Sequence, residues 1–178
     1  MHVKTKDMTM IAVMAALLCV VGPLTIFIGP IPLSLATFAI YLAGAVLGAK
    51  RGALVVALYL LIGLVGVPVF SGFSGGLQKL AGVTGGYLIG YLPCGWISGL
   101  GAGRDPGKDS SKLRLPAFMA LGTAVLYLIG TAWFMLQTKN GLAASLGMCV
   151  IPFLPGDACK IIAATLLAPP IRRALDRQ

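Results

Sequence analysis

Hydrophobic residues along this chain form long runs with almost no charged positions inside them. Runs without a polar face are typical of helices that lie among lipid or other helices, rather than of amphipathic surface helices. A helix needs roughly 17–25 residues to cross a bilayer core, and six runs come close to that length. They are Met8–Ile28, Leu33–Ala49, Gly52–Phe70, Thr84–Gly103, Leu115–Gln137 and Ile151–Leu167. The pattern therefore predicts an all-α membrane protein with six transmembrane helices, formed by residues 1–178 as a single domain.

Composition and the placement of charges add an orientation to this prediction. Of all residues, 58% are hydrophobic and 11% are charged, against about a quarter charged in soluble domains. Eleven of the fourteen Lys and Arg residues fall on one side of the predicted membrane: Lys4, Lys6, Lys50, Arg51, Arg104, Lys108, Lys112, Arg114, Arg172, Arg173 and Arg177. Lys79 and Lys139 fall on the other side, and Lys160 lies within the sixth run. Because cytoplasmic loops carry the excess of positive charge, both termini are predicted to be cytoplasmic, and the net charge of +9 does not indicate a nucleic-acid partner.

The outer segment between the third and fourth runs is rich in glycine. Residues 66–87 contain seven glycines, together with Phe70, Phe73 and Tyr87. Glycine exposes main-chain N–H groups, and irregular backbone at membrane depth is tolerated only where it is buried in protein or lines a cavity. We expect this segment to cover a ligand, the alternative being a merely flexible connection. The preceding outer loop, residues 29–37, carries no charge and is expected to fold back against the bundle.

A carboxylate and an ammonium group lie three residues apart in the sixth run, on Asp157 and Lys160. Charged side chains in a membrane segment are costly and by default indicate a functional site. Pro155 and Gly156 favour a helix start, so Asp157 falls in the first turn, where negative charge is stabilised. Lys160 then lies on the same face of the helix. The pair either neutralises itself or offers a ligand an acceptor beside a donor. We favour the ligand clamp, because an apolar pair would cost less to bury.

Several chemistries find no support in the sequence. No G-x-x-x-x-G-K-[ST] phosphate loop is present, so the chain is not expected to hydrolyse ATP. His2 is the only histidine, which argues against a metal centre or a histidine-based catalytic set. The cysteines show no C-x-x-C spacing and are interpreted as small core residues: Cys19, Cys94, Cys149 and Cys159. A membrane enzyme that uses the Asp157–Lys160 dyad stays open, but the residues favour a protein that binds a small ligand near its outer face.

Three stretches, in this order, resemble the BioY family. They are Val67-Pro-Val-Phe-Ser-Gly, Thr84-Gly-Gly-Tyr-Leu-Ile-Gly90 and Pro155-Gly-Asp-Ala-Cys-Lys160. BioY proteins are the biotin-binding substrate (S) components of energy-coupling-factor (ECF) transporters. The resemblance extends from about Met8 to Leu167 and implies the six-helix S-component fold in the cell membrane of a prokaryote. It also implies biotin as the ligand, no cofactor, and partnership with a transmembrane coupling subunit and two cytoplasmic ATPases.

The resemblance also suggests roles for single residues. Asp157 is expected to accept a hydrogen bond from the biotin ureido N–H, and Lys160 to donate to the ureido carbonyl or to the carboxylate. Aromatic rings would cover the biotin ring, and main-chain donors of the glycine segment would hold its tail. The expected binding residues are Asp157, Lys160, Tyr87, Phe70, Ser71, Gly75 and Gly76.

Two further positions concern the partner and the specificity of the chain. Ala12 and Ala16 lie one turn apart, which allows close helix contact, and the resemblance favours docking on the coupling subunit over internal packing. Ala36 stands where many relatives have glutamine, and Gln78 and Lys79 make the glycine segment more polar than usual. These departures are expected to change the affinity or the details of the contacts, but not the class of ligand. An S-component for another vitamin stays open separately as an alternative, and competition with biotin would distinguish it.

Overall fold

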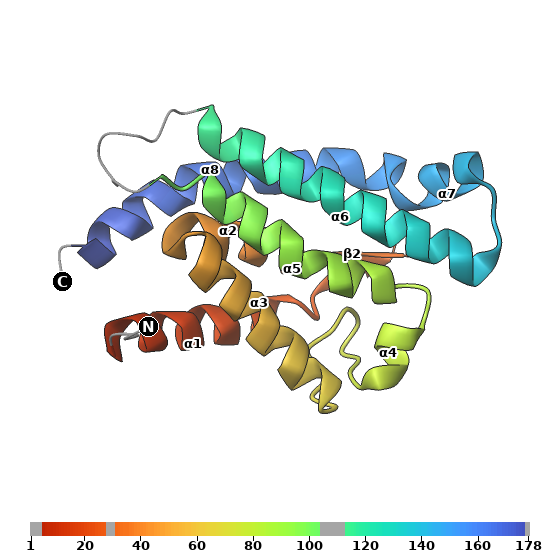
Figure 1. Ribbon diagram of the computed structural model, residues 1–178, viewed down its shortest axis with the longest axis horizontal. Helices are drawn as coiled ribbons and strands as arrows, with labels where there is room; N and C mark the ends of the chain where they lie inside the picture. The colour runs from red at the N-terminus through yellow and green to blue at the C-terminus, as the bar shows by residue number, and fades with distance from the viewer. Residues whose placement is uncertain (1–4, 28–30, 104–112, 177–178) are drawn as a thin grey trace.

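The computed structural model describes residues 5–27, 31–103 and 113–176. Within these ranges the chain folds into eight α-helices, one short 3-10 helix and one small hairpin (Figure 1). The elements are α1 (Thr5–Val21), β1 (Thr25–Phe27), β2 (Pro32–Ser34), α2 (Ala36–Leu47), α3 (Ala49–Leu64), α4 (Leu77–Ala81), α5 (Gly85–Leu100), α6 (Arg114–Thr138), α7 (Leu142–Cys149), η1 (Ile151–Phe153) and α8 (Leu154–Asp176).

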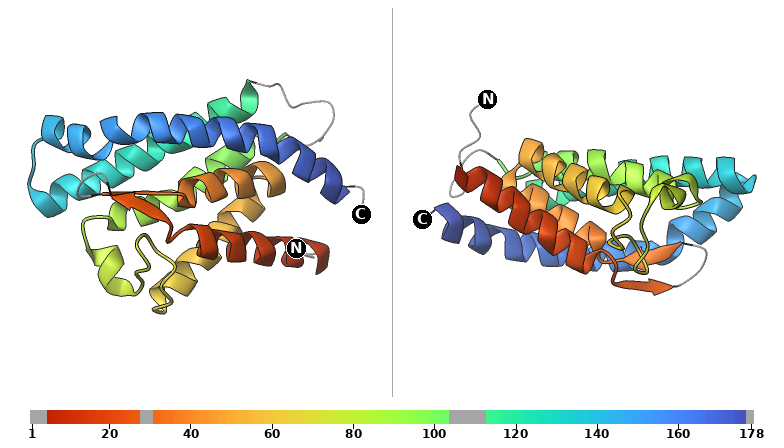
Figure 2. Two further views of the ribbon diagram at one scale, coloured as in Figure 1. Left: turned by 180° about the vertical axis from the view of Figure 1, so that it is seen from behind. Right: turned by 90° about the horizontal axis from the view of Figure 1, so that it is seen from below.

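Helix α2 lies at the centre of the bundle and is buried along nearly its whole length. It packs against α1, α3, α5 and α8, while α5 packs against α3 and most extensively against α6. Figures 1 and 2 show α5, α6 and α8 running along the long axis of the molecule, with α1 and α3 on the other side of α2. The core is therefore formed where α2 and α5 meet their neighbours.

The first predicted helix is shorter in the structure than in the sequence-based prediction. Helix α1 ends at Val21, and Thr25–Phe27 pairs antiparallel with Pro32–Ser34 instead of continuing the helix. Pro23 supplies no backbone donor for a further helical turn. A Cβ at Gly22 would be 2.8 Å from the hydroxyl of Tyr59, so the chain turns where only glycine fits. Because β2 leads into α2, the second helix also starts later than predicted, at Ala36.

Other helix ends differ because hydrophobic runs do not stop where helices stop. Gly48 has a φ of +81°, a conformation that glycine tolerates, and separates α2 from α3. Helix α3 ends at Leu64, before the predicted end at Phe70, and Gly66 has a φ of +112°. Helix α8 continues to Asp176, beyond the apolar run that ends at Leu167. By length and composition alone, two described segments qualify as membrane spans: α6, and Leu142–Leu175, which includes α7, η1 and most of α8.

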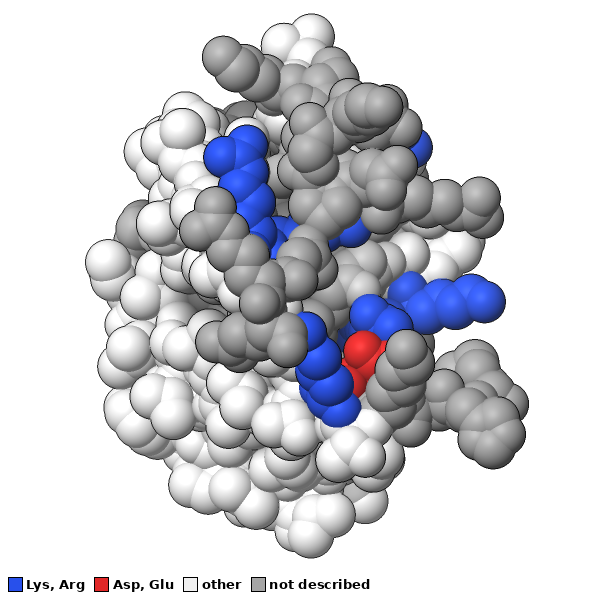
Figure 3. Space-filling model, turned by 90° about the vertical axis from the view of Figure 1, so that its left-hand side faces the viewer, with Lys and Arg blue, Asp and Glu red and all other residues white. Residues whose placement is uncertain are grey.

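Cationic side chains gather at one end of the bundle, which faces the viewer in Figure 3. The described ones belong to the start of α1, the α2–α3 junction, the start of α6 and the end of α8: Lys6, Lys50, Arg51, Arg114, Arg172 and Arg173. Lys79 on α4 and Lys139 after α6 lie at the opposite end. Some of the cations also tie elements together, since Arg51 pairs with Asp7 at 2.6 Å and the Lys6 ammonium donates to the Leu175 carbonyl at 2.8 Å. The described charges thus follow the two-sided distribution that the sequence predicts.

Candidate functional site

A cavity of about 50 Å³ lies at the end of the bundle away from the cationic cluster. It has room for a few water molecules. Five parts of the chain build its walls: the β1–β2 hairpin with the start of α2, the segment around α4, and helices α5, α6 and η1–α8. Most of the lining is apolar or aromatic, and the described charged residues that reach it are Lys79, Asp157 and Lys160.

Asp157 and Lys160 form an ion pair inside the protein, as one turn of α8 places them on the same face. The Lys160 Nζ is 2.9 Å from Oδ1 of Asp157, and the two side chains are 9% and 7% exposed. Asp157 lies in the first turn of α8, where the unpaired N–H groups of the helix stabilise a negative charge. A buried charge needs such a partner, since an isolated one is very costly to remove from water.

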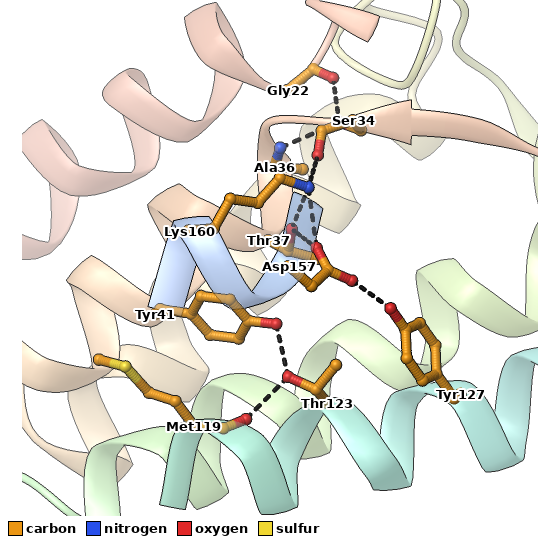
Figure 4. Close-up of polar contacts among 10 residues, drawn as sticks. All are labelled: Gly22, Ser34, Ala36, Thr37, Tyr41, Met119, Thr123, Tyr127, Asp157 and Lys160. Carbon is orange, nitrogen blue, oxygen red and sulfur yellow. Dashed lines mark hydrogen bonds and ion pairs between the residues drawn. The ribbon is translucent and has the colours of Figure 1, made fainter. Parts of the chain in front are cut away.

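The ammonium group of Lys160 uses all its donors within the protein. It donates to Oδ1 of Asp157 at 2.9 Å, to the backbone carbonyl of Ser34 at 2.7 Å, and to Oγ1 of Thr37 at 3.0 Å (Figure 4). An ammonium group has three N–H bonds, so these acceptors saturate it. The hairpin is what delivers the Ser34 carbonyl, because the Ser34 hydroxyl itself donates to the Gly22 carbonyl at 2.7 Å and fixes the strand end against α1.

The carboxylate of Asp157, in contrast, keeps capacity for another donor. Oδ1 accepts from Lys160 and from the Thr37 hydroxyl at 3.2 Å, and Oδ2 accepts from the Tyr127 hydroxyl at 2.5 Å (Figure 4). A carboxylate offers about four acceptor positions, and the described side chains fill three of them. One acceptor position therefore remains open for a ligand N–H.

Sequence reasoning missed Ser34, Thr37 and Tyr127 as members of this network. Each lies more than 29 positions from Asp157 and in a different element. A hydroxyl group within an apolar run is only a weak indication of a binding site, because Ser and Thr side chains commonly form hydrogen bonds with nearby backbone groups. Only the tertiary arrangement identifies these hydroxyl and carbonyl groups as partners of the ion pair.

The residues expected from the glycine segment divide into two groups. Tyr87 and Ser71 line the cavity, and so does Lys79. Phe70 does not: it is fully buried against Tyr59, with ring centroids 5.5 Å apart in an edge-to-face arrangement. Its ring occupies the space that the missing side chain of Gly63 leaves. Phe70 therefore packs in the core, and its contact with a ligand stays a prediction.

Gly75 and Gly76 also lie outside the cavity lining. The N–H group of Gly76 already donates to the Gly63 carbonyl at 2.7 Å. A Cβ at Gly75 would be 2.4 Å from the Val67 carbonyl oxygen, so glycine allows the backbone to pack closely there. These two residues fasten the segment to the end of α3, and their main-chain contacts to a ligand tail stay a prediction.

Ala12 and Ala16 lie on the exposed face of α1, together with Val13 and Val20. The opposite face, with Ile11, Met14, Ala15 and Leu18, is the one that is buried. Among the described residues, Ala12 and Ala16 therefore do not pack against another helix of this chain. Among those residues, no cluster of His, Cys, Asp and Glu side chains could hold a metal ion.

Comparison with known proteins shows which proteins this chain resembles. The model of the BioY family matches residues 1–177. A probable biotin transporter BioY of Pyrococcus horikoshii is 38% identical over 165 residues, covering 93% of this chain and 95% of the relative. Biotin transporter BioY2 of Lactococcus lactis is 34% identical, covering 98% and 94%. A crystal structure of the S-component for biotin from an ECF-type ABC transporter superposes with a TM-score of 0.84 at 28% identity, covering 96% and 92% of the two chains.

Proposed function

The chain belongs to the BioY family, and on that premise we propose that it is the biotin-binding S-component of an ECF-type uptake transporter. The observation that carries the proposal is the buried carboxylate of Asp157, which is held in place by three donors and retains one open acceptor position in an aromatic-lined cavity. Such a group suits a ligand that presents a neutral N–H donor at the end of an apolar body.

The chemical groups of biotin complement those that line the cavity. Its ureido head carries N–H donors, its thioether ring is apolar, and its tail ends in a carboxylate. Oδ2 of Asp157 would accept from a ureido N–H, and a hydrogen bond to a charged acceptor is stronger than a neutral one. Tyr87 and Tyr91 line the cavity and would cover the ring. Lys160 would balance and orient the carboxylate of Asp157 rather than act as a nucleophile, since its donors are already engaged.

We propose the following membrane arrangement. Helices α1, α2, α3, α5, α6 and α8 cross the plasma membrane of a prokaryote as one domain, with the cationic end and both termini in the cytoplasm and the cavity near the outer face. Helix α2 has 12 residues, which corresponds to about 18 Å of helix, and the hairpin fills the remaining depth above it. Irregular backbone at this depth is acceptable because it lines the cavity.

Capture of a ligand requires a wall of the cavity to move, because about 50 Å³ does not hold a molecule of the size of biotin. The segment around α4 is suited to this movement, since α4 has no buried residue. Its far end is held to α6 by hydrogen bonds from Trp133 Nε1 to the Gly82 carbonyl at 3.0 Å and from Gln137 Nε2 to the Ala81 carbonyl at 2.9 Å. We infer that this segment opens for entry and closes over the ligand.

Release of biotin inside the cell would depend on partner subunits. A transmembrane coupling subunit with two cytoplasmic ATPases would supply the energy. The exposed face of α1 around Ala12 and Ala16 is suited to the coupling subunit, because small side chains allow a partner helix to approach closely.

Titration of the purified protein in detergent with biotin, riboflavin and thiamine tests the ligand. We expect biotin to bind with a stoichiometry of one and the two other vitamins not to compete. Recovery of unchanged biotin after incubation would argue against an enzyme. Absence of biotin binding, or tighter binding of another vitamin, would overturn the assignment.

A further inference from the structure

We propose that Lys79, and not Lys160, is the cation that pairs with the carboxylate of the ligand, and that the cavity is thereby specific for monoanions. The inference deepens the proposed function and rests on it. It assigns the two ends of the ligand to two different elements, with the head at α8 and the charged tail at α4.

Lys160 has no donor left for a ligand. Its three N–H bonds are directed to Asp157, Ser34 and Thr37 at 2.7–3.0 Å. A ligand carboxylate could bind Lys160 only if one of these buried acceptors lost its partner, and leaving a buried polar group unsatisfied is unfavourable. The saturation of Lys160 therefore directs the tail elsewhere.

The charges that reach the cavity do not cancel. Asp157 and Lys160 neutralise each other, and Lys79 is the remaining described charge among the lining residues. The empty cavity therefore carries one net positive charge. A cation that becomes enclosed without a counter-charge is strongly disfavoured, whereas a monoanionic ligand supplies that counter-charge.

Lys79 is placed where a ligand tail would end. It lines the same cavity as Asp157 but comes from α4, and Figures 1 and 2 show α4 on a different side of the bundle from α8. Its side chain is partly buried, and among the described residues no acceptor lies within hydrogen-bond distance of its ammonium group. The hydrogen bonds from Trp133 and Gln137 to the end of α4 hold this helix against α6. A ligand that bridges from Asp157 to Lys79 would thus bind the mobile segment to the rigid bundle.

The experiment compares biotin with biotinamide, which has the same ureido head and ring but a neutral tail. Both are titrated into the wild type, Lys79→Gln, Lys79→Arg and Lys139→Gln in detergent. Lys139 is the matched control, since it is an exposed lysine at this end that does not line the cavity. We expect the wild type to prefer biotin at least about tenfold, as a charged pair exceeds a neutral hydrogen bond. In Lys79→Gln this preference should disappear, because biotin binds more weakly while biotinamide binds as before. Lys79→Arg and Lys139→Gln should retain it.

The other possible results distinguish a failure of this inference from a failure of the proposed function. If Lys79→Gln keeps the preference, or weakens both ligands equally, Lys79 does not contact the carboxylate and the inference is wrong. If the wild type binds biotin and biotinamide equally well, the inference is wrong while the proposed function stands. If the wild type binds neither, the proposed function fails, and this inference fails with it.

Discussion

Asp157 receives hydrogen bonds from three elements: Thr37 on α2, Tyr127 on α6 and Lys160 on α8. These donors hold the carboxylate in one orientation before any ligand arrives. Preorganisation of this kind lowers the cost of ordering a site on binding. The affinity of the site should therefore depend on the residues that hold Asp157 in place as well as on Asp157 itself.

Tyr127→Phe tests this dependence. The substitution removes the donor to Oδ2 of Asp157 and leaves the ring in place, so the carboxylate loses one of its constraints. We expect biotin to bind more weakly by about 1.5–3 kcal/mol, the range of one hydrogen bond to a charged group. Tyr41→Phe is the control, because the Tyr41 hydroxyl is bonded to Thr123 and not to Asp157. Equal affinities of the two variants in a biotin titration would contradict the role of Tyr127.

Substitutions of the two members of the ion pair are expected to affect stability and biotin binding differently, which gives a second test. Asp157→Asn and Lys160→Met each leave one buried charge without its partner, and we expect each to lower the unfolding free energy by about 3–5 kcal/mol. The double substitution removes both charges, so thermal unfolding in detergent should recover much of the loss. Biotin binding should be lost in Asp157→Asn and in the double variant, since both lack the charged acceptor for the ureido head. Tight binding by the double variant would contradict the role of Asp157.

The sequence indicates some residues of the site and not others. Asp157 and Lys160 are visible because charges in an apolar run are costly. Their partners are not visible, since Thr37 is 120 positions away from Asp157 and its hydroxyl resembles any other in a membrane helix. Phe70 was assigned to the ligand because aromatic rings commonly cover ligands, yet the space beside Gly63 accommodates it in the core.

At the scale of elements, the crossing of α2, α3 and α5 depends on glycines that let backbones touch. A Cβ at Gly99 on α5 would be 2.4 Å from the backbone nitrogen of Ala49, and one at Gly44 on α2 would be 2.9 Å from the Gly95 carbonyl oxygen. Backbone atoms cannot rotate away as side chains can. The spacing of these three helices is therefore fixed by the absence of side chains.

Gly99→Ala should consequently destabilise the protein, although alanine is the better helix former. The added methyl group forces α5 away from the start of α3, and overpacking of this kind costs about 1–3 kcal/mol. Gly147→Ala on α7 is the matched control, since nothing lies within 4 Å of its Cβ position. Thermal unfolding in detergent should show a lower midpoint for Gly99→Ala alone. Equal midpoints would mean that the crossing is looser than described.

Helices were predictable as elements, but their ends and the hairpin were not. A hydrophobic run predicts a buried segment without distinguishing a strand from a helix when the run is short. Thr25–Phe27 was therefore included in the first helix, although Gly22 and Pro23 end it. Helix α4 was hidden in a segment whose glycines indicate irregular backbone, and its five residues are too few to show a period.

At the scale of the whole molecule, the proposed ligand cavity and the proposed partner surface lie apart. The cavity lies among the hairpin, α4, α5, α6 and α8, whereas Ala12 and Ala16 are exposed on α1. Substitutions on α1 should therefore affect transport without affecting capture.

Ala16→Leu tests this separation. A larger side chain on the exposed face should keep a partner helix at a distance. We expect the purified variant to bind biotin as the wild type does, while uptake by cells that also express the coupling subunit and ATPases falls at least about tenfold, the effect of roughly 1.4 kcal/mol on association. Ala120→Leu, also exposed but on α6, is the control for a bulkier surface residue. Normal uptake by Ala16→Leu would place the partner elsewhere.

The net charge of the cavity has a consequence for the electrical work of transport. A membrane potential acts on each unit charge with about 2.3 kcal/mol per 100 mV, and a negative cell interior repels a bare anion. Asp157, Lys160 and Lys79 sum to one positive charge among the described lining residues, so a bound monoanion makes the loaded cavity neutral. With Lys79 holding the carboxylate, the loaded cavity changes its depth in the membrane without working against the field. The work against the field then falls on the return of the empty, positively charged cavity, because each cycle still moves one negative charge inward.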